Sequence, residues 1–324
     1  MKLDPPLRLL DPPDAAAWDA FVASADGATV FHTSAWASLW TASWRDAAWR
    51  AIVLEEGGAI QAAIGAIVRR RGLFWSVDAM PFATYGGPLV RRGHRDPSGA
   101  RAALLEAFGA WVSSRRVLRW QLAWYEGSAA ELPERLPRSE EFTHVVALKR
   151  SFDELAEGFS PSTRRLVRQA EESGLSIRAI ATEEDLRAFY DMAVETVRRR
   201  GGTPKPYALY ERVFERLVPG GFARYHLVAH GETAVAASLH LFHEGVATNW
   251  LPVSRSASWP LRPNNYLIAN VLASLCDAGY LEYNFGASPA DALGLIRFKE
   301  GWGATRRPVL VAANRSALHR KLRA

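Results

Sequence analysis

Tyr280-Leu281-Glu282-Tyr283-Asn284-Phe285 is an aromatic and apolar run that predicts a strand, and it follows a helical pattern that ends at Ala278. Upstream of that helix, three short runs joined by tight turns predict antiparallel neighbouring strands: Arg224–Ala229, Thr233–Phe242 and Val246–Pro252. A strand, a helix and a further strand in that order imply a parallel crossover. The second half of the chain is therefore expected to be α+β, with a mixed, mostly antiparallel sheet flanked by helices.

This predicted strand leads toward a lysine, Lys299, that lies between Phe298 and Trp302 in a glycine-punctuated segment. The chain has lysine only at Lys2, Lys149, Lys205, Lys299 and Lys321, and elsewhere it uses arginine as its basic residue of fixed charge. Lysine loses its proton readily when buried, whereas arginine does not. An ammonium beside glycines predicts a compact charge for a phosphate or a developing oxyanion, with Phe298 and Trp302 at the same site. The alternative is a solvated lysine on a loop.

Polar residues near this lysine and on the predicted strands are further candidates. Asp291 is the nearest acid that precedes the lysine and is a candidate general base. Asn284 and Ser288 lie at a strand end where ligands of crossover sheets bind, although either could satisfy backbone groups at a bend. Of Asn249 and Trp250, only one side chain can line a cleft, because successive side chains of a strand alternate.

Two helix starts supply the remaining candidates. Arg164 and Arg168 share one face of a predicted helix at i, i+4, where a solvated face is the alternative to a binding role. Asn264 and Asn265 stand at the start of the long helix and could cap it. Asn265 or the adjacent Tyr266 could instead contact a substrate.

Composition limits the class of protein. A length of 324 residues with 48% hydrophobic content predicts two domains with sizeable cores. The single cysteine, Cys276, excludes an internal disulfide and a multi-thiolate metal site, and no metal is expected. Neither an amino-terminal signal nor an apolar run of about 18 residues is visible, which predicts a cytoplasmic protein with at most peripheral membrane contact.

The net charge of +6 is spread along the chain and predicts a weakly basic surface. Such a surface suits an anionic substrate, a tRNA or an anionic membrane face, and it does not predict DNA binding. Both halves are predicted to contain helices, a three-strand meander, a helix and a strand, which suggests a duplicated fold. The Pro-, Glu- and Arg-rich segment 126–141 predicts the boundary between domains at 1–145 and 146–324.

The chain resembles the Fem-type family, whose members are built from two domains of the Gcn5-related (GNAT) acyltransferase fold. The family includes the peptidoglycan interpeptide-bridge aminoacyltransferases and related acetyltransferases. The resemblance covers about residues 29–304 and is carried by six segments in the same order: Phe31–Trp36, Tyr85–Pro88, the helix with Arg164 and Arg168, Leu261–Leu267, Tyr283–Gly286 and Gly294–Gly303.

This resemblance implies an enzyme that transfers an aminoacyl or acyl group to an amine of a cell-envelope, exopolysaccharide or peptide acceptor. It implies that Lys299 stabilises negative charge on the reacting ester or on a donor phosphate. It also implies that Arg164 or Arg168 holds an acceptor phosphate or carboxylate. No tightly bound cofactor is expected, and the acyl donor is aminoacyl-tRNA or acyl-coenzyme A.

Two departures from the family pattern bear on the substrates. Leu39-Trp40 stands where the peptidoglycan enzymes tend to carry a lysine for a nucleotide diphosphate, which weakens the case for a muramyl-peptide acceptor. The segment 256–264, at the expected coenzyme A phosphate loop, has no glycine and contains two prolines that remove amide donors. A carrier-bound or tRNA-bound acyl group therefore ranks above coenzyme A, although the long helical insertion of some tRNA-using members has no room here.

Two other functions stay open. One is an ordinary N-acetyltransferase that uses acetyl-coenzyme A. The other is a non-catalytic scaffold or binding protein of an envelope-assembly complex. The sequence predicts neither the donor, the acceptor nor the oligomeric state.

Overall fold

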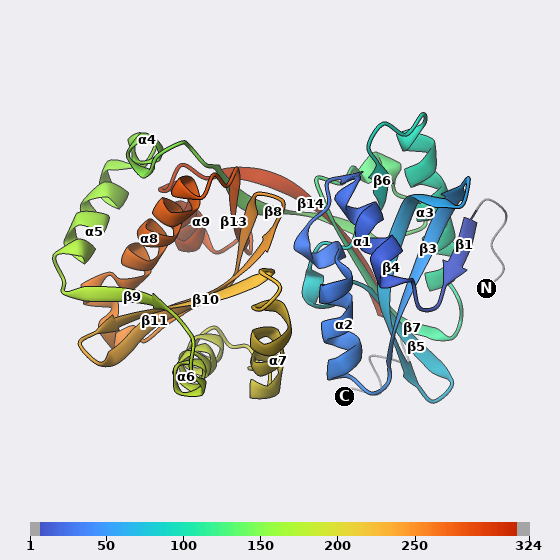
Figure 1. The fold of residues 1–324 in the computed structure, drawn as a ribbon. Helices are drawn as coiled ribbons and strands as arrows, with labels where there is room; N and C mark the ends of the chain where they lie inside the picture. The colour runs from blue at the N-terminus through green and yellow to red at the C-terminus, as the bar shows by residue number, and fades with distance from the viewer. Residues whose placement is uncertain (1–6, 316–324) are drawn as a thin grey trace. The chain divides into compact units, whose positions relative to one another are not determined.

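The computed structural model describes residues 7–315, and the chain divides into two compact units. Within the described range, the first unit holds residues 7–141 and 308–315, and the second holds residues 142–307. Each unit contains a sheet with helices on both faces (Figure 1). The predicted boundary between residues 145 and 146 falls inside a strand, β8 (Arg138–Ala147).

The first unit is a six-stranded sheet with two additional short strands. In chain order its elements are β1 (Leu7–Leu10), α1 (Ala15–Ala23), β2 (Ala25–Asp26), α2 (Ser34–Ser43), β3 (Ala47–Glu56), β4 (Ala59–Arg71), β5 (Phe74–Ala79), β6 (Leu89–Arg91), α3 (Pro97–Val112), β7 (Val117–Tyr125) and the greater part of β14 (Thr305–Arg315). The strand order is β1-β3-β4-β5-β7-β14, with β6 beside β4 and β2 beside β6. β5 and β7 are parallel, and the other pairs in this unit are antiparallel.

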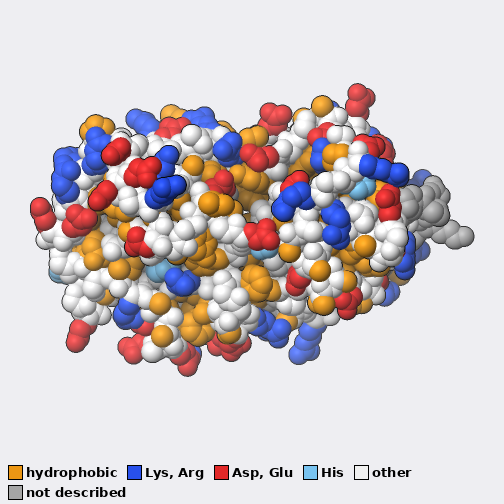
Figure 2. All heavy atoms as spheres, turned by 45° about the horizontal axis from the view of Figure 1, so that its top comes forward, with side chains coloured by type: hydrophobic (Ala, Val, Ile, Leu, Met, Phe, Trp, Pro, Cys, Tyr) orange, Lys and Arg blue, Asp and Glu red, His pale blue; other side chains and the backbone are white. Residues whose placement is uncertain are grey.

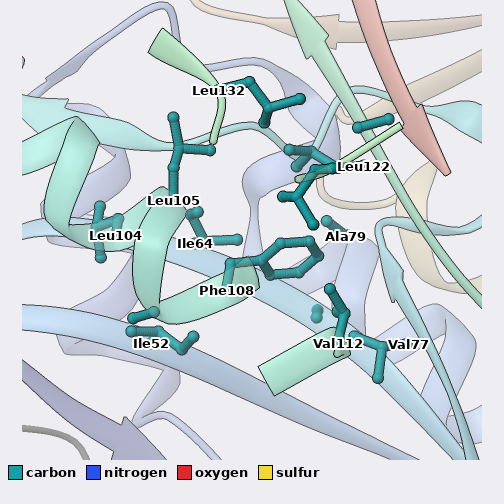
Figure 3. Packing of buried hydrophobic residues seen from close by; sticks show 14 of the residues in the cluster. Ile52, Ile64, Val77, Ala79, Leu104, Leu105, Phe108, Val112, Leu122 and Leu132 are labelled. Carbon is teal, nitrogen blue, oxygen red and sulfur yellow. The ribbon is translucent and has the colours of Figure 1, made fainter. Parts of the chain in front are cut away.

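The core of the first unit lies between α3 and the sheet. Phe108 and Leu104 of α3 are fully buried and pack with Ile52 of β3 and Ile64 of β4 (Figure 3). α1 and α2 cover the opposite face, where Leu39 and Trp40 are both buried. Leu39 and Trp40 are therefore part of the core.

The second unit contains β8, α4 (Phe152–Glu157), α5 (Pro161–Glu171), β9 (Leu175–Ala179), α6 (Glu183–Arg199), α7 (Tyr207–Leu217), β10 (Ala223–His230), β11 (Thr233–His243), β12 (Val246–Ser254), α8 (Pro263–Asp277), β13 (Glu282–Ala287) and α9 (Leu293–Glu300). From β9 to β13, it repeats the order of elements from β1 to β7 without the short strands β2 and β6, and it has β8, α4, α5 and α9 in addition. The strand order is β8-β13-β12-β11-β10-β9. α4, α5 and α8 lie on one face, and α6 and α7 lie on the other (Figure 1).

The meander β10-β11-β12, the crossover helix α8 and the parallel strand β13 confirm the predicted α+β organisation. Among the strands from β8 onward, three were absent from the prediction: β8, β9 and β14. β8 begins with four exposed polar residues inside the segment interpreted as a linker, so its composition hid the strand. β14 lies in the predicted second domain, but it pairs with β7 of the first unit along residues 309–315.

In the first unit, the loop after β5 fills the space between the ends of the parallel strands β5 and β7. β5 and β7 stay paired up to Ala79 and Leu122, and the loop after β5 then returns between the strand ends. The N–H of Gly86 donates to the Ala123 carbonyl at 2.8 Å, and a Cβ built on Gly86 would lie 2.1 Å from the Ala79 carbonyl oxygen. Because that gap is far below van der Waals contact, only glycine fits here.

We expect Gly86→Ala to destabilise the protein by about 1–3 kcal/mol, because the new methyl group meets backbone and not a movable side chain. Urea unfolding measures this loss. Gly294→Ala is the matched control, since a Cβ at Gly294 meets nothing within 4 Å and helix propensity favours alanine. Equal stability of the two variants would show that the loop does not fill the space between β5 and β7.

Candidate functional site

The candidate site is a cavity in the second unit where β12 and β13 diverge. The two strands pair in parallel at only three positions, Val246 with Glu282, Ala247 with Tyr283 and Thr248 with Asn284. Beyond these positions the strands separate, and a cavity of about 210 Å³ lies among β12, β13, α6, α8 and α9. Ligands of sheets with crossovers bind in such a crevice at the carboxyl ends of the strands.

Lys299 lines this cavity from α9 and is only 5% exposed. Its Nζ donates to the carbonyl oxygens of Gly286 at 2.6 Å and Ala287 at 3.1 Å. Burial, and secondarily the charge of Arg200, lower the pKa of Lys299 to about 8. At neutral pH the group is therefore mainly an ammonium, and these two bonds leave one of its three N–H donors for a ligand.

The end of β13 is shaped to supply those two carbonyls. The Asn284 side chain accepts from Thr143 Oγ1 at 2.6 Å and from the N–H of Gly286 at 2.8 Å. Gly286 has a φ of +78°, a conformation that favours glycine. The turn at Asn284 and Gly286 thus directs the carbonyl oxygens of Gly286 and Ala287 toward Lys299.

Two arginines bring further positive charge to the cavity. Arg199 and Arg200 lie at the carboxyl end of α6 and line the cavity with Lys299. Arg199 stacks over the Trp259 ring at 4.8 Å and pairs with Glu195 at 3.4 Å. The described cavity lining contains three cationic side chains and no carboxylate, so it favours an anionic ligand.

The rest of the lining is partly apolar and partly amide or hydroxyl. Pro252, Leu267, Ile268, Phe285, Leu295 and Phe298 form its apolar part. Asn264 Nδ2 and Trp259 Nε1 both donate to Ser254 Oγ, at 3.2 and 3.1 Å. An apolar cavity with cations at one side suits an acyl group carried by an anionic molecule.

The start of α8 offers few backbone donors to that anion. Pro263 has no N–H, and the N–H groups of Asn265 and Tyr266 already donate to the Arg262 carbonyl. A cradle of several free amides is therefore missing from this helix start. Charged side chains, chiefly Arg199 and Arg200, are the available partners for a phosphate.

Four of the sequence candidates line the cavity: Asn249, Asn264, Phe298 and Lys299. The others lie outside its lining. Trp250 takes the opposite side of β12, with Lys205 Nζ 5.7 Å from its ring. Asp291 is exposed in the loop before α9, and no interaction joins it to Lys299 among the described contacts. The structure therefore gives no support to a base role for Asp291.

Several of the remaining candidates have structural partners. Arg164 Nη1 donates to the carbonyls of Ala156, Glu157 and Phe159, at 3.4, 3.2 and 2.7 Å, and so caps α4. Trp302 is fully buried in the core, edge-on to Phe159.

The last four candidates are placed as follows. Asn265 and Ser288 are buried, Tyr266 is half-buried against the core, and Arg168 is exposed on α5. Asn265, Tyr266, Ser288 and Arg168 stay predictions.

Sequence reasoning missed Arg199 and Arg200, because they lie far from Lys299 in the chain. The run Arg198-Arg199-Arg200 at the end of a predicted helix was the available signal. On the face shown in Figure 2, basic and acidic side chains are interspersed, whereas the described cavity lining contains basic side chains and no carboxylate.

Two further searches of the structure bear on the site. Within residues 7–315, no group of three or more His, Cys, Asp or Glu side chains is placed to hold a metal ion. Over the same described range, no helix has both the length and the apolar character needed to cross a bilayer.

Comparison with known proteins finds a family match in the second unit and fold matches over most of the chain. Residues 159–300 match the family model of the acetyltransferase (GNAT) domain, which spans α5 to α9 and so includes the whole cavity. No curated protein matches the sequence.

Solved structures share the fold over nearly the whole chain. FemX aligns with a TM-score of 0.69 at 14% identity, over 94% of this chain and 96% of its own. A tandem GNAT protein from the clavulanic acid biosynthesis pathway aligns with a TM-score of 0.52 at 15% identity, over 95% and 98%. The C-terminal domain of a putative lysylphosphatidylglycerol synthetase from Agrobacterium fabrum gives 0.51 at 14% identity, over 81% and 83%. Residues 159–300 are therefore similar to a GNAT acetyltransferase domain, and the chain shares the fold of FemX and of a tandem GNAT protein.

Proposed function

We propose that this protein transfers an aminoacyl or acyl group from a phosphate-bearing donor to an amine, and that the reaction takes place in the cavity between β12 and β13. The buried Lys299 ammonium at that divergence is the observation that carries the proposal. The acyl carbonyl would lie against its remaining N–H, which would stabilise the oxyanion of the tetrahedral intermediate.

Arg199 and Arg200 would hold the donor's phosphate in place of backbone amides. The apolar part of the lining would limit water beside the acyl group, which favours attack by an amine over hydrolysis. Such direct transfer needs neither a metal nor a covalent enzyme intermediate. The donor is a substrate that binds and leaves, whether aminoacyl-tRNA or an acyl-coenzyme A.

A second candidate, acetyl-coenzyme A-dependent N-acetylation, is favoured by the match of residues 159–300 to an acetyltransferase domain. The proline at the start of α8 argues against it, because the amides that would bind the cofactor's diphosphate are missing. An envelope-precursor acceptor and a cytoplasmic location stay predictions of the sequence.

The direct test is to incubate the protein with acetyl-coenzyme A, charged tRNAs and envelope-precursor nucleotides, and to detect transfer by mass spectrometry. We expect one donor to support transfer to an amine. Binding of these compounds without transfer from any of them would favour a non-catalytic binding protein.

Lys299→Met should lower the rate of transfer at least about 100-fold, because the oxyanion loses its donor. The same change should leave the fold intact or make it more stable at pH 7. Because the pKa of Lys299 is lowered from 10.5 to about 8, holding its charge in the folded protein costs about 3 kcal/mol. The methionine removes this cost, but it leaves the carbonyls of Gly286 and Ala287 without their donor, which offsets part of the gain. A large drop in melting temperature would instead assign Lys299 a structural role.

The pH profile separates an ammonium from a neutral base at Lys299. With a weakly basic amine such as methoxyamine as acceptor, we expect the rate to fall about tenfold per pH unit above pH 8, because the ammonium deprotonates there. Lys299→Arg, if active, should lack this fall, since arginine stays charged. A rate that rises through pH 8 would show that the neutral lysine acts as a base.

Arg200→Gln should raise the Michaelis constant of the donor about tenfold, because a charge-assisted contact with phosphate is lost. The rate constant at saturating donor should change little. Arg198→Gln is the matched control, since Arg198 is exposed on α6 and outside the cavity lining. Equal effects of the two substitutions would remove Arg200 from the donor site.

A further inference from the structure

A buried network of hydrogen-bonded side chains runs from strand to strand in the sheet of the second unit and ends at the cavity. His226 Nδ1 lies 3.2 Å from His240 Nδ1, and His240 Nε2 lies 3.1 Å from the Tyr283 hydroxyl. The Asn249 side chain completes the network through a hydrogen bond with that hydroxyl. His240 and Tyr283 are fully buried, and Asn249 is only 3% exposed.

The network has a defined direction. Burial holds the pKa of His240 well below its usual value, so this imidazole is neutral and has one donor and one acceptor nitrogen. Burial raises the pKa of Tyr283, and the Asn249 contact opposes the rise, as a donor to the phenolic oxygen does. Because Asn249 Oδ1 has no partner as placed, Nδ2 makes the contact with Tyr283, and the Tyr283 hydroxyl then donates to His240 Nε2. His240 Nδ1 can then donate to His226 or to Ser238 Oγ, which is 3.1 Å away.

This direction fixes the other end of the Asn249 amide. Its Oδ1 is buried and has no hydrogen-bond partner among residues 7–315, although Asn249 lines the cavity. A buried carbonyl oxygen without a donor costs about 1–3 kcal/mol. Asn249 Oδ1 is thus an acceptor that an N–H or O–H group of a ligand could satisfy.

Asn249 and Lys299 face the same space with opposite hydrogen-bonding character. Lys299 donates to the carbonyl of Gly286, and a Cβ built on Gly286 would lie 3.5 Å from the Asn249 backbone oxygen. The cavity at the divergence of β12 and β13 is therefore lined by both a donor and an acceptor side chain. A tetrahedral intermediate between an acyl group and an amine needs this pair, with the donor on the oxyanion and the acceptor on the nitrogen.

We propose that Asn249 Oδ1 binds an N–H of the attacking amine, and that Tyr283, held by His240, is a positioning residue that orients the Asn249 amide. This inference rests on the proposed acyl transfer. It assigns the acceptor subsite and makes the nucleophile a primary amine, not a hydroxyl group.

The balance of the reaction explains this preference. The amine lone pair forms the new C–N bond, the carbonyl electron pair moves to the oxygen at Lys299, and the donor's C–O or C–S bond then breaks. One amine proton passes through solvent to the leaving oxygen or sulfur. A neutral primary amine still keeps one N–H on Asn249 through the intermediate and in the amide product. A hydroxyl group loses its only hydrogen during attack, so it would leave Asn249 Oδ1 unpaired again.

The test measures how an acyl donor is divided between an amine and water. Acetyl-coenzyme A and a charged tRNA serve as donors, and a panel of amino sugars, amino acids and diamines serves as acceptors. Asn249→Ala should lower transfer to the amine about tenfold, as expected for one lost hydrogen bond, while donor hydrolysis stays the same or rises. Tyr283→Phe should shift the same ratio in the same direction by a smaller factor, because the amide loses only its orientation.

Asn270→Ala is the matched control. Asn270 lies on α8, its Nδ2 donates to the Tyr266 carbonyl at 2.8 Å, and it is outside the cavity lining, so the ratio should not change. Equal loss of aminolysis and hydrolysis in Asn249→Ala would overturn the inference and assign Asn249 to the donor or the fold. Faster acylation of hydroxyl compounds than of amines by the unaltered protein would also overturn it. Absence of any transfer by the unaltered protein would contradict the proposed function itself.

Discussion

The site depends on two hydrogen bonds from the Lys299 ammonium to the carbonyls of Gly286 and Ala287. They form only because β13 turns away from β12 after three paired positions, and the Asn284 amide and the positive φ of Gly286 make that turn. The same divergence opens the cavity. The turn at the end of β13 therefore both supplies the two carbonyls and opens the cavity, and the carbonyl bonds offset part of the cost of burying the charged lysine.

The two units share an arrangement of strands but differ at the ends of their parallel strand pairs. Each has a three-strand antiparallel meander, a crossover helix and a strand parallel to the third. In the first unit, Gly86 fills the space between the ends of the parallel strands, with its N–H on one strand and its Cα against the other. In the second unit that space is left open and is lined by charged and polar side chains. The residues that surround the opening, more than the fold, separate a candidate catalytic unit from its companion.

Sequence patterns predicted four of the six strands of the second unit, β10 to β13, because the turns between them are short; β8 and β9 were missed. The patterns also indicated Lys299, since lysine is scarce here, and Asn249, since only one of Asn249 and Trp250 can face the cleft from a strand. They could not predict the partners that only folding brings together. Arg199 and Arg200 reach the cavity from α6, and the Asn249 amide is oriented by Tyr283 and His240 on two other strands. β14 was missed because its pairing with β7 joins segments far apart in the chain.

Direct observation of the Lys299 ammonium by nitrogen-15 NMR tests this account most simply, because the few lysines of the chain can be assigned by substitution. The account predicts a pKa near 8, well below the ordinary 10.5, that rises when a phosphate-bearing acyl donor binds and places negative charge beside it. A pKa near 10.5 that does not respond to any donor would contradict it, because Lys299 would then be a solvated surface residue.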